Sequence, residues 1–209
     1  MTIILAAGLV PSTPRALQYL STADFIACCD GAANACHAAG FTPNVIVGDA
    51  DSIAPELREQ YADRIVRIPE QETNDLTKTF RHCLSLGHRE FVILGATGLR
   101  EDHAMANLAL LMDYIDELPA PPLGQVPSIT LVSDFGTFYP CRDQVRLKVE
   151  VGREVSIFNF GAEYFSAAGL EYPLYDFTRL WQGTLNKATS PEICINARGK
   201  FLVYVAEED

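Results

Sequence analysis

Basic side chains are scarce in this sequence: 16 Lys and Arg residues stand against 27 Asp and Glu residues, and the formal net charge is −11. A protein that binds along a nucleic-acid duplex needs clustered Lys and Arg side chains to replace condensed counterions. This charge therefore argues against a nucleic-acid-binding protein. An acidic protein can still bind phosphate groups through a metal ion or through a few local cations.

Cysteine pairs and long apolar runs are also scarce. The six cysteines show neither Cys-x-x-Cys spacing nor the density of a disulfide scaffold, so reduced thiols are expected. The apolar stretch Met1–Val10 is too short to span a bilayer and has no basic leader. We expect a cytoplasmic protein with no membrane anchor and no signal peptide.

The first half of the chain alternates short apolar runs with helical patterns, which is typical of βαβ units and a parallel sheet. The expected strands are Ile3–Ala7, Phe25–Cys29, Val45–Val47, Ile65–Arg67 and Phe91–Leu94. The expected helices are Arg15–Leu20, Ala32–Ala39, Pro55–Tyr61, Asn74–Leu86 and Asp102–Glu117. By helical spacing, the last helix should bury Met105, Leu108, Met112 and Ile115.

A chain of 209 residues, 48% of them hydrophobic, can form one large or two small domains. The proline-rich stretch Leu118–Pro127 has the composition of a linker and predicts a boundary between domains at 1–122 and 123–209. Beyond it, short alternating strands with glycine and proline turns predict a small antiparallel sandwich or barrel. These strands are expected at Ile129–Val132, Gln144–Glu150, Glu154–Asn159, Ile193–Ala197 and Phe201–Val205.

Two aspartates separated by one residue, Asp49 and Asp51, follow the apolar run Val45–Val47. Mg²⁺ prefers oxygen ligands and usually takes one or two carboxylates, while phosphates and water complete its octahedron. Asp51 or Ser52 can equally well cap a helix that begins near Pro55. The motif alone does not choose between a metal site and a helix cap.

Three more polar segments lie where expected strands end and helices begin, at residues 30–34, 73–78 and 95–103. The carboxyl ends of parallel strands form one edge of an open α/β sheet, and ligands bind in the crevice there. Asp75 and Lys78 are three residues apart and project together, which places a carboxylate for a metal beside a cation for a phosphate. A phosphoryl-transfer site needs that combination.

Several of these side chains also have purely structural interpretations. Asp30 can cap the helix that follows it, Asn74 can be an N-cap, and Lys78 can be a solvated surface residue. His103 and Asn107, four residues apart, share a helix face and can satisfy local polar groups.

Together these motifs resemble those of the thiamine pyrophosphokinase family. The resemblance rests on Cys29–Asn34, Gly48–Ile53, Thr73–Lys78 and Gly95–His103, and it extends to Gly169–Leu174 and Gly183–Asn186. It implies an ATP:thiamine diphosphotransferase that produces thiamine diphosphate and AMP. It also implies an α/β, Rossmann-like ATP-binding domain with a parallel sheet, a C-terminal antiparallel β-sandwich, and a homodimer with thiamine near the subunit interface.

The resemblance implies roles for individual residues. The positions for Mg²⁺ are Asp49, Asp51 and Asp75. The basic positions near the ATP phosphates are Lys78 and Arg100. The other nucleotide positions are Asp30, Gly31, Asn34, Thr73, Asn74 and His103. The positions near thiamine are Asp102, Thr184, Leu185 and Asn186. The departures from the family pattern are Ala32, Leu99, Leu185 and Lys187, and no acidic position is lost.

The implied reaction is attack of the thiamine hydroxyl on the β-phosphorus of ATP, in which alignment and charge neutralisation supply most of the catalysis. Asp102 is expected to orient or deprotonate the hydroxyl, and His103 is a weaker candidate for this role. Trp181, the single tryptophan, can stack on the cationic thiazolium ring or can anchor the core of the sandwich.

Two other functions stay open. An Asp-x-Asp motif after a strand also suits a phosphohydrolase in which Asp49 is the nucleophile, which predicts a phospho-aspartate and release of inorganic phosphate without thiamine. A non-catalytic nucleotide or thiamine sensor would bind at the same site without forming AMP.

Overall fold

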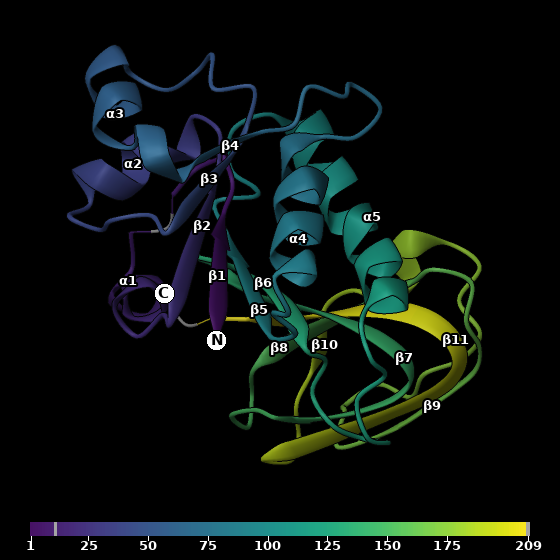
Figure 1. Ribbon diagram of the computed structural model, residues 1–209. Helices are drawn as coiled ribbons and strands as arrows, with labels where there is room; N and C mark the ends of the chain where they lie inside the picture. The colour runs from purple at the N-terminus through teal and green to yellow at the C-terminus, as the bar shows by residue number, and fades with distance from the viewer. Residues whose placement is uncertain (11, 208–209) are drawn as a thin grey trace. The chain divides into compact units, whose positions relative to one another are not determined.

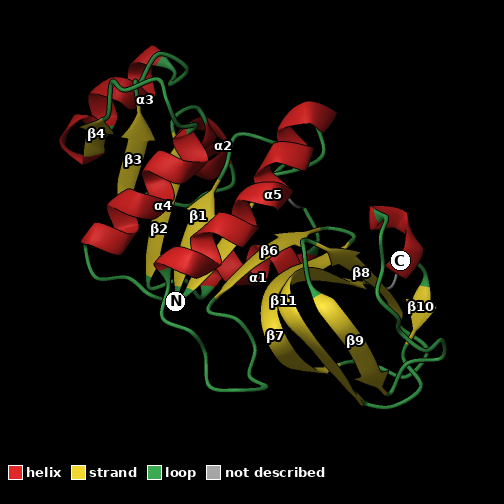
Figure 2. Ribbon diagram, turned by 90° about the vertical axis from the view of Figure 1, so that its right-hand side faces the viewer, coloured by secondary structure: helices red, strands yellow, loops and turns green. Residues whose placement is uncertain are grey.

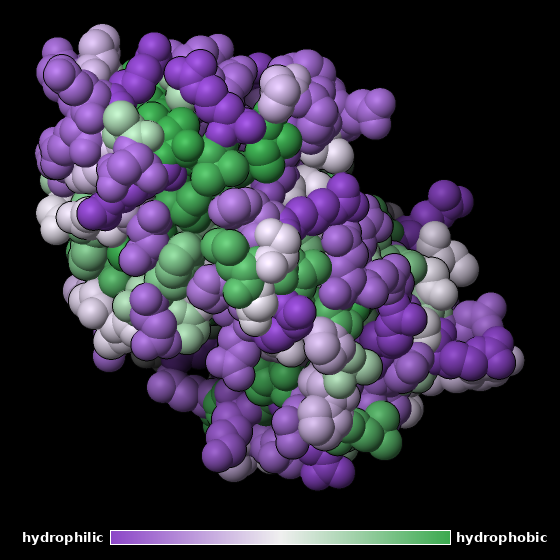
Figure 3. All heavy atoms as spheres, viewed as in Figure 1, coloured by the Kyte–Doolittle hydropathy of each residue, from purple (hydrophilic) through white to green (hydrophobic). Residues whose placement is uncertain are grey.

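The computed structural model describes residues 1–10 and 12–207 and divides the chain into two compact units (Figure 1). The first unit contains Met1–Leu110 and Leu131–Asp134, and the second contains Leu111–Thr130 and Phe135–Asp209. Within the described ranges, no helix combines the length and the apolar character that a membrane span requires. On the face drawn in Figure 3, hydrophilic side chains cover most of the surface, with apolar atoms visible between them.

The first unit is built on a parallel sheet with the strand order β5-β1-β2-β3-β4, and β6 follows β5 in that order. The strands are β1 (Thr2–Leu5), β2 (Phe25–Cys29), β3 (Val45–Gly48), β4 (Ile65–Arg67), β5 (Phe91–Leu94) and β6 (Ile129–Ser133). Ile4 of β1 lies opposite Ala27 of β2 and Ile93 of β5. Every residue of β1, β3 and β5 is buried, as expected for parallel strands with both faces covered. The five predicted strands of this half are therefore confirmed.

Helices lie on both sides of this sheet in the view of Figure 2. They are α1 (Pro14–Ser21), α2 (Ala32–Ala38), α3 (Pro55–Gln60), α4 (Asp75–Ser85) and α5 (Glu101–Glu117), with a 3₁₀ turn, η1, at Ala62–Arg64. α1 begins where Thr13 accepts a hydrogen bond from the Ala16 N–H and Pro14 fixes the first helical φ. α4 contacts β1, β2 and β3 and buries Leu76, Phe80 and Cys83.

The structure decides one alternative that the sequence left open and corrects one prediction. α3 begins after Ala54, which makes no side-chain cap, so neither Asp51 nor Ser52 caps this helix. Met105 is 71% exposed, and the residues that α5 buries are Leu111, Met112 and Tyr114. Periodicity predicts the spacing of a buried stripe but not where along the helix the packing begins.

The second unit is an antiparallel sheet organised around the long strand β11 (Glu192–Ala206). One edge of β11 pairs with β7 (Gly136–Lys148), and the other pairs with β9 (Glu163–Ala168) and then with β8 (Glu154–Asn159). β10 (Asn186–Lys187) pairs with β8. The buried core of this unit includes Leu147, Ile157, Phe165, Ile193, Ile195, Phe201 and Val203. The antiparallel character predicted for this half is confirmed.

The predicted strands Ile193–Ala197 and Phe201–Val205 are the two halves of one strand, β11, so their separation was wrong. The pairing register shifts between Asn196 and Lys200, and Gly199 there has a φ of +121°. Such an irregularity interrupts the alternation of apolar and polar residues by which a strand is recognised.

β7 begins at Gly136 rather than at the predicted Gln144. Pro140 and the neighbouring charges of Arg142 and Asp143 obscure the alternation in its first half. The short strands β9 and β10 were not predicted.

Candidate active site

Three carboxylates gather at the carboxyl ends of two neighbouring strands of the first unit. Asp30 follows β2, Asp49 follows β3, and oxygen atoms of these two residues and of Asp51 lie within 4.8 Å of one another. These three residues form what we call the acidic cluster. Gly48 makes the approach possible, because a Cβ atom at this position would lie 2.7 Å from the Cβ of Asp30. Several oxygen ligands in such a group suit a hard cation.

Asp30 is the buried member of the acidic cluster, with 5% of its surface exposed. Its Oδ2 accepts a hydrogen bond from the Ser52 N–H at 3.2 Å, whereas its Oδ1 is buried without a hydrogen-bond partner among the described residues. Burial raises the pKa of Asp30, and the charges of Asp49 and Asp75 raise it further. The N-cap of α2 is Gly31, so Asp30 does not have the capping role that its position allowed.

The loop that carries Asp49 and Asp51 has a strained backbone. Ala50 has a φ of +68°, in the left-handed region that non-glycine residues rarely adopt. The Asp51 N–H donates to Asp49 Oδ1 at 3.2 Å, and the Ser52 hydroxyl donates to Asp51 Oδ1 at 2.8 Å. The Ser52 hydroxyl is the main reason why the pKa of Asp51 is lowered, and hydrogen bonding with Asp49 adds to the effect.

Asn34 and Gly31 support the same loop. Asn34 Nδ2 donates to the Ser52 carbonyl at 2.8 Å, and its Oδ1 accepts from the Ala54 N–H at 2.9 Å. Gly31 lies close to the loop, since a Cβ atom there would be 3.0 Å from the Cβ of Ser52. Both ends of the Asn34 amide are thus bonded to the backbone that follows the acidic cluster.

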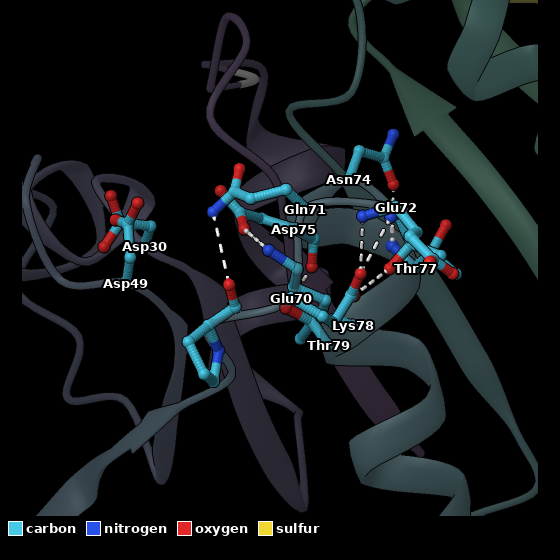
Figure 4. A network of polar contacts seen from close by, with 12 residues as sticks. Asp30, Asp49, Glu70, Gln71, Glu72, Asn74, Asp75, Thr77, Lys78 and Thr79 are labelled. Carbon is cyan, nitrogen blue, oxygen red and sulfur yellow. Dashed lines mark hydrogen bonds and ion pairs between the residues drawn. The ribbon is translucent and has the colours of Figure 1, made fainter.

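The start of α4 brings a carboxylate and an ammonium group together. Asn74 caps the helix, because its Oδ1 accepts from the Thr77 N–H at 2.9 Å. Lys78 Nζ lies 3.3 Å from Asp75 Oδ1, and Figure 4 shows this pair apart from Asp30 and Asp49. The Lys78 side chain is 5% exposed, so it is not a solvated surface residue. The pairing predicted from the spacing of Asp75 and Lys78 is confirmed.

Glu70 is a polar neighbour that the sequence motifs did not include. Its carboxylate accepts hydrogen bonds from the N–H groups of Glu72 at 2.7 Å and Thr73 at 3.0 Å, and from the Thr73 hydroxyl. The Thr73 hydroxyl is the main reason why the pKa of Glu70 is lowered, and the charge of Lys78 contributes. These bonds order the turn before α4 and occupy the side chain of Thr73 (Figure 4).

A cavity of about 340 Å³ lies where the central strands end, between the last residue of β2, the segments that follow β1 and β5, and the first turns of α4 and α5. Four of the predicted site residues line it: Asn74, Asp75, Arg100 and His103. Leu99, which departs from the family pattern, also lines the cavity and is 62% exposed. The segment that opens α4 and the segment that follows β5 therefore meet at the edge where open α/β sheets bind ligands, whereas Asp30, Asp49 and Asp51 do not line this cavity.

Asn107 joins two walls of this cavity. Its Nδ2 donates to the Ala96 carbonyl at 2.9 Å, and its Oδ1 accepts from Asn74 Nδ2 at 3.3 Å. The spacing of His103 and Asn107 indicated a shared helix face, but the link to Asn74 requires the tertiary structure.

Arg100 and Asp102 form a bidentate ion pair at the start of α5. Arg100 Nη2 lies 2.6 Å from Asp102 Oδ2, and Nε lies 3.1 Å from Oδ1. Hydrogen bonding from Arg100 is the main reason why the pKa of Asp102 is lowered to about 2, and the His103 N–H also donates to Oδ1 at 2.9 Å. A carboxylate with this pKa is a weak base near neutral pH.

In the second unit, the side chains of Trp181 and Leu185 are both 71% exposed. Trp181 lies in the 3₁₀ turn η2 (Leu180–Gly183), so it does not anchor the core. Leu185 has a φ of +61°, and its N–H donates to Ser156 Oγ at 3.2 Å. The Thr184 hydroxyl donates to the Trp181 carbonyl at 2.7 Å. Strained backbone beside exposed apolar side chains is common in ligand-binding segments.

Asn186 differs from its neighbours, because it is 5% exposed and its amide is bonded to backbone. Its Nδ2 donates to the Tyr172 carbonyl at 2.8 Å, and its Oδ1 accepts from the N–H groups of Tyr172 at 3.0 Å and Lys187 at 2.8 Å. Asn186 therefore ties the segment that contains Tyr172 to the start of β10.

Two protein-family models match the chain. The model described as thiamin pyrophosphokinase, catalytic domain, matches residues 16–119. The model described as thiamin pyrophosphokinase, substrate-binding domain, matches residues 136–204. The first range contains the acidic cluster and every lining residue of the cavity except those that follow β1, and the second contains Trp181 and Leu185.

A curated relative, thiamin pyrophosphokinase 1 from Caenorhabditis elegans, is 35% identical over 97 residues, which make up 44% of this chain and 37% of the relative. The alignment thus spans little more than a third of that relative's length. A thiamine pyrophosphokinase structure from Bacillus subtilis matches with a TM-score of 0.78 at 20% identity, over 100% of both chains. A thiamin pyrophosphokinase family structure from Enterococcus faecalis matches with a TM-score of 0.80 at 18% identity, over 100% of this chain and 99% of the other. At these identities the structures show a shared mixed α/β fold.

Proposed function

Because the chain belongs to the thiamin pyrophosphokinase family, we propose that it transfers a diphosphate group from ATP to the hydroxyl of thiamine, with AMP and thiamine diphosphate as products. The observation that carries this proposal is the cavity at the carboxyl ends of the parallel strands, which both Asp75 and Arg100 line. Phosphoryl-transfer sites combine cationic side chains with carboxylates that hold a metal ion.

The metal in this proposal is Mg²⁺, held by Asp49, Asp51 and Asp75 with Asp30 as a further carboxylate. The buried Asp30 Oδ1 supports the fit, because a carboxylate oxygen without a donor is stabilised by a nearby cation. Asp75 lies outside the acidic cluster, but its charge contributes to the raised pKa of Asp30, after the larger effect of burial. When bound, Mg²⁺ would neutralise charge on the phosphate oxygens and help to align them.

The ATP phosphates in this proposal lie near the amino end of α4 and the loop before α5. Lys78 and Arg100 supply positive charge there, and the free N–H groups at a helix start favour anions. Asn74, Thr73 and His103 complete the nucleotide side of the site. The Asp75–Lys78 pair places one positive and one negative group where the phosphate charge changes during transfer.

Asp102 is the residue that we assign to the attacking hydroxyl of thiamine. Its low pKa, about 2, means that it accepts a hydrogen bond from the hydroxyl more readily than it accepts the proton itself. We therefore infer that Asp102 orients the hydroxyl for attack on the β-phosphorus. Alignment of this kind supplies a large part of the rate enhancement of two-substrate reactions.

For thiamine itself, we propose contacts with Trp181, Thr184 and Leu185 of the second unit. The exposed Trp181 ring supports stacking on the cationic thiazolium, which is worth about 0.5–2 kcal/mol. Asn186 has its amide bonded to backbone, so its contribution in this proposal is to hold the segment in place.

The finer architecture is also a proposal. We propose a Rossmann-like ATP-binding domain at residues 1–122 and a β-sandwich domain for thiamine at residues 123–209. The proline-rich stretch, most of which lies between the ranges of the two family models, supports this boundary. We further propose a cytoplasmic homodimer with thiamine bound near the subunit interface.

The test is incubation of the protein with ATP, Mg²⁺ and thiamine, with AMP and thiamine diphosphate followed by chromatography. We expect both products to appear in equal amounts and only when all three components are present. Release of inorganic phosphate without thiamine, with a phospho-aspartate at Asp49, would instead indicate a phosphohydrolase. Saturable binding of ATP or thiamine without AMP would indicate a sensor, and either result contradicts the proposal.

A further inference from the structure

Arg58 of α3 contacts the loop of the acidic cluster through the backbone of that loop. Its Nη2 donates to the carbonyl oxygens of Asp51 and Ile53, each at 3.2 Å. The contacts of Arg58 alternate along the chain with those of Asn34, which bonds the Ser52 carbonyl and the Ala54 N–H. Each residue from 51 to 54 thus has one backbone group held by one of these two side chains. The sequence motifs did not include Arg58.

The Arg58 side chain carries a desolvation cost, because part of its charged group is buried without a hydrogen bond to any described residue. Its Nε is buried and has no hydrogen-bond partner among the described residues, although it belongs to a charged group. The loop that it contacts contains Ala50 with a φ of +68°. A strained backbone of this kind persists only where the surroundings hold it in place. Arg58 is placed to hold it, because its bonds begin at the residue after Ala50.

We propose that Arg58 is a positioning residue for the cation site: by holding the backbone of the Asp49–Asp51 loop, it keeps the carboxylates close together, and its loss weakens cation binding. The inference rests on the proposed function only for the assignment of Mg²⁺ to the acidic cluster. Electrostatics alone predicts the opposite sign, since removal of a positive charge near three carboxylates favours a bound cation. The sign of the change in cation affinity therefore separates the two roles.

The experiment compares the wild-type protein with Arg58→Met, Arg58→Lys and the control Arg64→Met. Arg64 is also a partly buried arginine that donates to a backbone carbonyl, that of Pro43, at 2.6 Å, so the control removes the same charge and a similar bond elsewhere in the first unit. Two quantities are measured without nucleotide: binding of Mn²⁺ alone, from the EPR signal of the free ion, and amide hydrogen exchange in residues 49–54.

For Arg58→Met we expect Mn²⁺ affinity to fall roughly 10-fold, as is typical when a residue that orients metal ligands is removed. Exchange at the Ser52 and Ala54 amides should become faster. Arg58→Lys should show a smaller change in the same direction, because an ammonium group cannot reproduce the planar donor geometry of a guanidinium. Arg64→Met should leave both quantities as in the wild type.

Unchanged or tighter Mn²⁺ binding in a folded Arg58→Met protein overturns the proposal. If Arg58→Met does not fold, the result for Arg58→Lys is used instead. Wild-type Mn²⁺ affinity together with wild-type amide exchange in Arg58→Lys also overturns the proposal. A wild-type protein that binds no Mn²⁺ contradicts the metal assignment of the proposed function instead. The exchange measurement then decides the role of Arg58 by itself, because faster exchange requires no bound metal.

Discussion

The acidic cluster and two ion pairs of the first unit, Asp75–Lys78 and Asp102–Arg100, present their carboxylates in opposite ways. Among the described residues, Asp30, Asp49 and Asp51 have no Lys or Arg partner in an ion pair, and they lie within 4.8 Å of one another. Asp75 and Asp102 are each paired, with Lys78 at 3.3 Å and Arg100 at 2.6 Å. Three close carboxylates repel one another until a cation is added, whereas the paired groups are already neutralised. The difference indicates that the acidic cluster is the part of the site completed by a metal.

The backbone near the acidic cluster also differs from the backbone near the Asp102–Arg100 pair, because different residue types adopt positive φ angles in the two places. In the segments that carry the acidic cluster, the positive φ angles belong to non-glycine residues, Asp30 at +37° and Ala50 at +68°. In the loop that leads to Arg100, they belong to Gly95 at +67° and Gly98 at +90°. Glycine adopts such angles without strain, whereas other residues need support from their surroundings. The acidic cluster thus combines electrostatic repulsion with backbone strain.

The largest effect is expected when a carboxylate of the acidic cluster is neutralised. Asp49→Asn should lower kcat/KM on the order of 1000-fold, because a bound metal contributes several kcal/mol of charge stabilisation. Without Mg²⁺ the same variant should unfold at a higher temperature than the wild type, because one of three repelling charges is gone. Product formation and thermal unfolding measure the two effects. Asp63→Asn, in the exposed turn η1, is the control, and wild-type turnover in Asp49→Asn would remove the metal assignment.

A smaller effect is expected when one of the ion pairs is broken. Lys78→Met keeps an unbranched side chain in a buried position and removes the cation beside Asp75. Turnover should fall on the order of 100-fold, as for loss of one preorganised electrostatic group. Mn²⁺ binding should not weaken, because the change removes a positive charge beside Asp75, a proposed metal ligand, and leaves the acidic cluster intact. A large loss of Mn²⁺ binding would show that the two regions do not act separately.

A further prediction concerns the acidic cluster alone and needs no activity measurement: the thermal stability of the protein should depend on the protonation of Asp30. Burial and the charges of Asp49 and Asp75 raise the pKa of Asp30 in the folded protein. The stability that the protonated Asp30 contributes is therefore fully present below its unfolded pKa, and it is lost as the pH rises through the folded pKa. Thermal unfolding of the metal-free protein should show this loss as the pH rises from the ordinary carboxyl pKa through the raised pKa of the folded state. Asp30→Asn should abolish it, and excess Mg²⁺ should oppose it.

Much of the first unit could be predicted from the sequence because its signals are local. Short apolar runs identify parallel strands, and topology alone brings the residues after those strands to one edge. The family resemblance, which rested on the spacing of such segments, is confirmed by the two family models. The spacing of Asp75 and Lys78 also predicted their pairing, because a helix fixes which side chains are neighbours.

The remaining features depend on contacts between distant segments. The closeness of Asp30 to Asp49 depends on packing around Gly48, and the burial of Lys78 depends on the packing of α4, neither of which a local pattern reveals. Met105 was wrongly expected to be buried, since periodicity does not say which part of a helix is covered. The role of Arg58 could not be predicted either, because it bonds to backbone carbonyls, and these carry no sequence signature.

The smallest effect is expected from a change that relieves the strain in the acidic cluster. Ala50→Gly should alter the free energy of unfolding by less than about 1 kcal/mol, because relief of about 1 kcal/mol of left-handed strain is offset by about 0.8 kcal/mol for the lost buried methyl group. Its Mn²⁺ affinity should nevertheless fall, since glycine lets the loop move. Gly95→Ala provides the contrast: its Cβ would lie 2.7 Å from the Ala6 carbonyl oxygen, so denaturant unfolding should show a loss of more than about 2 kcal/mol. If Ala50→Gly kept wild-type Mn²⁺ binding, the strained backbone of this loop would have no part in holding the cation.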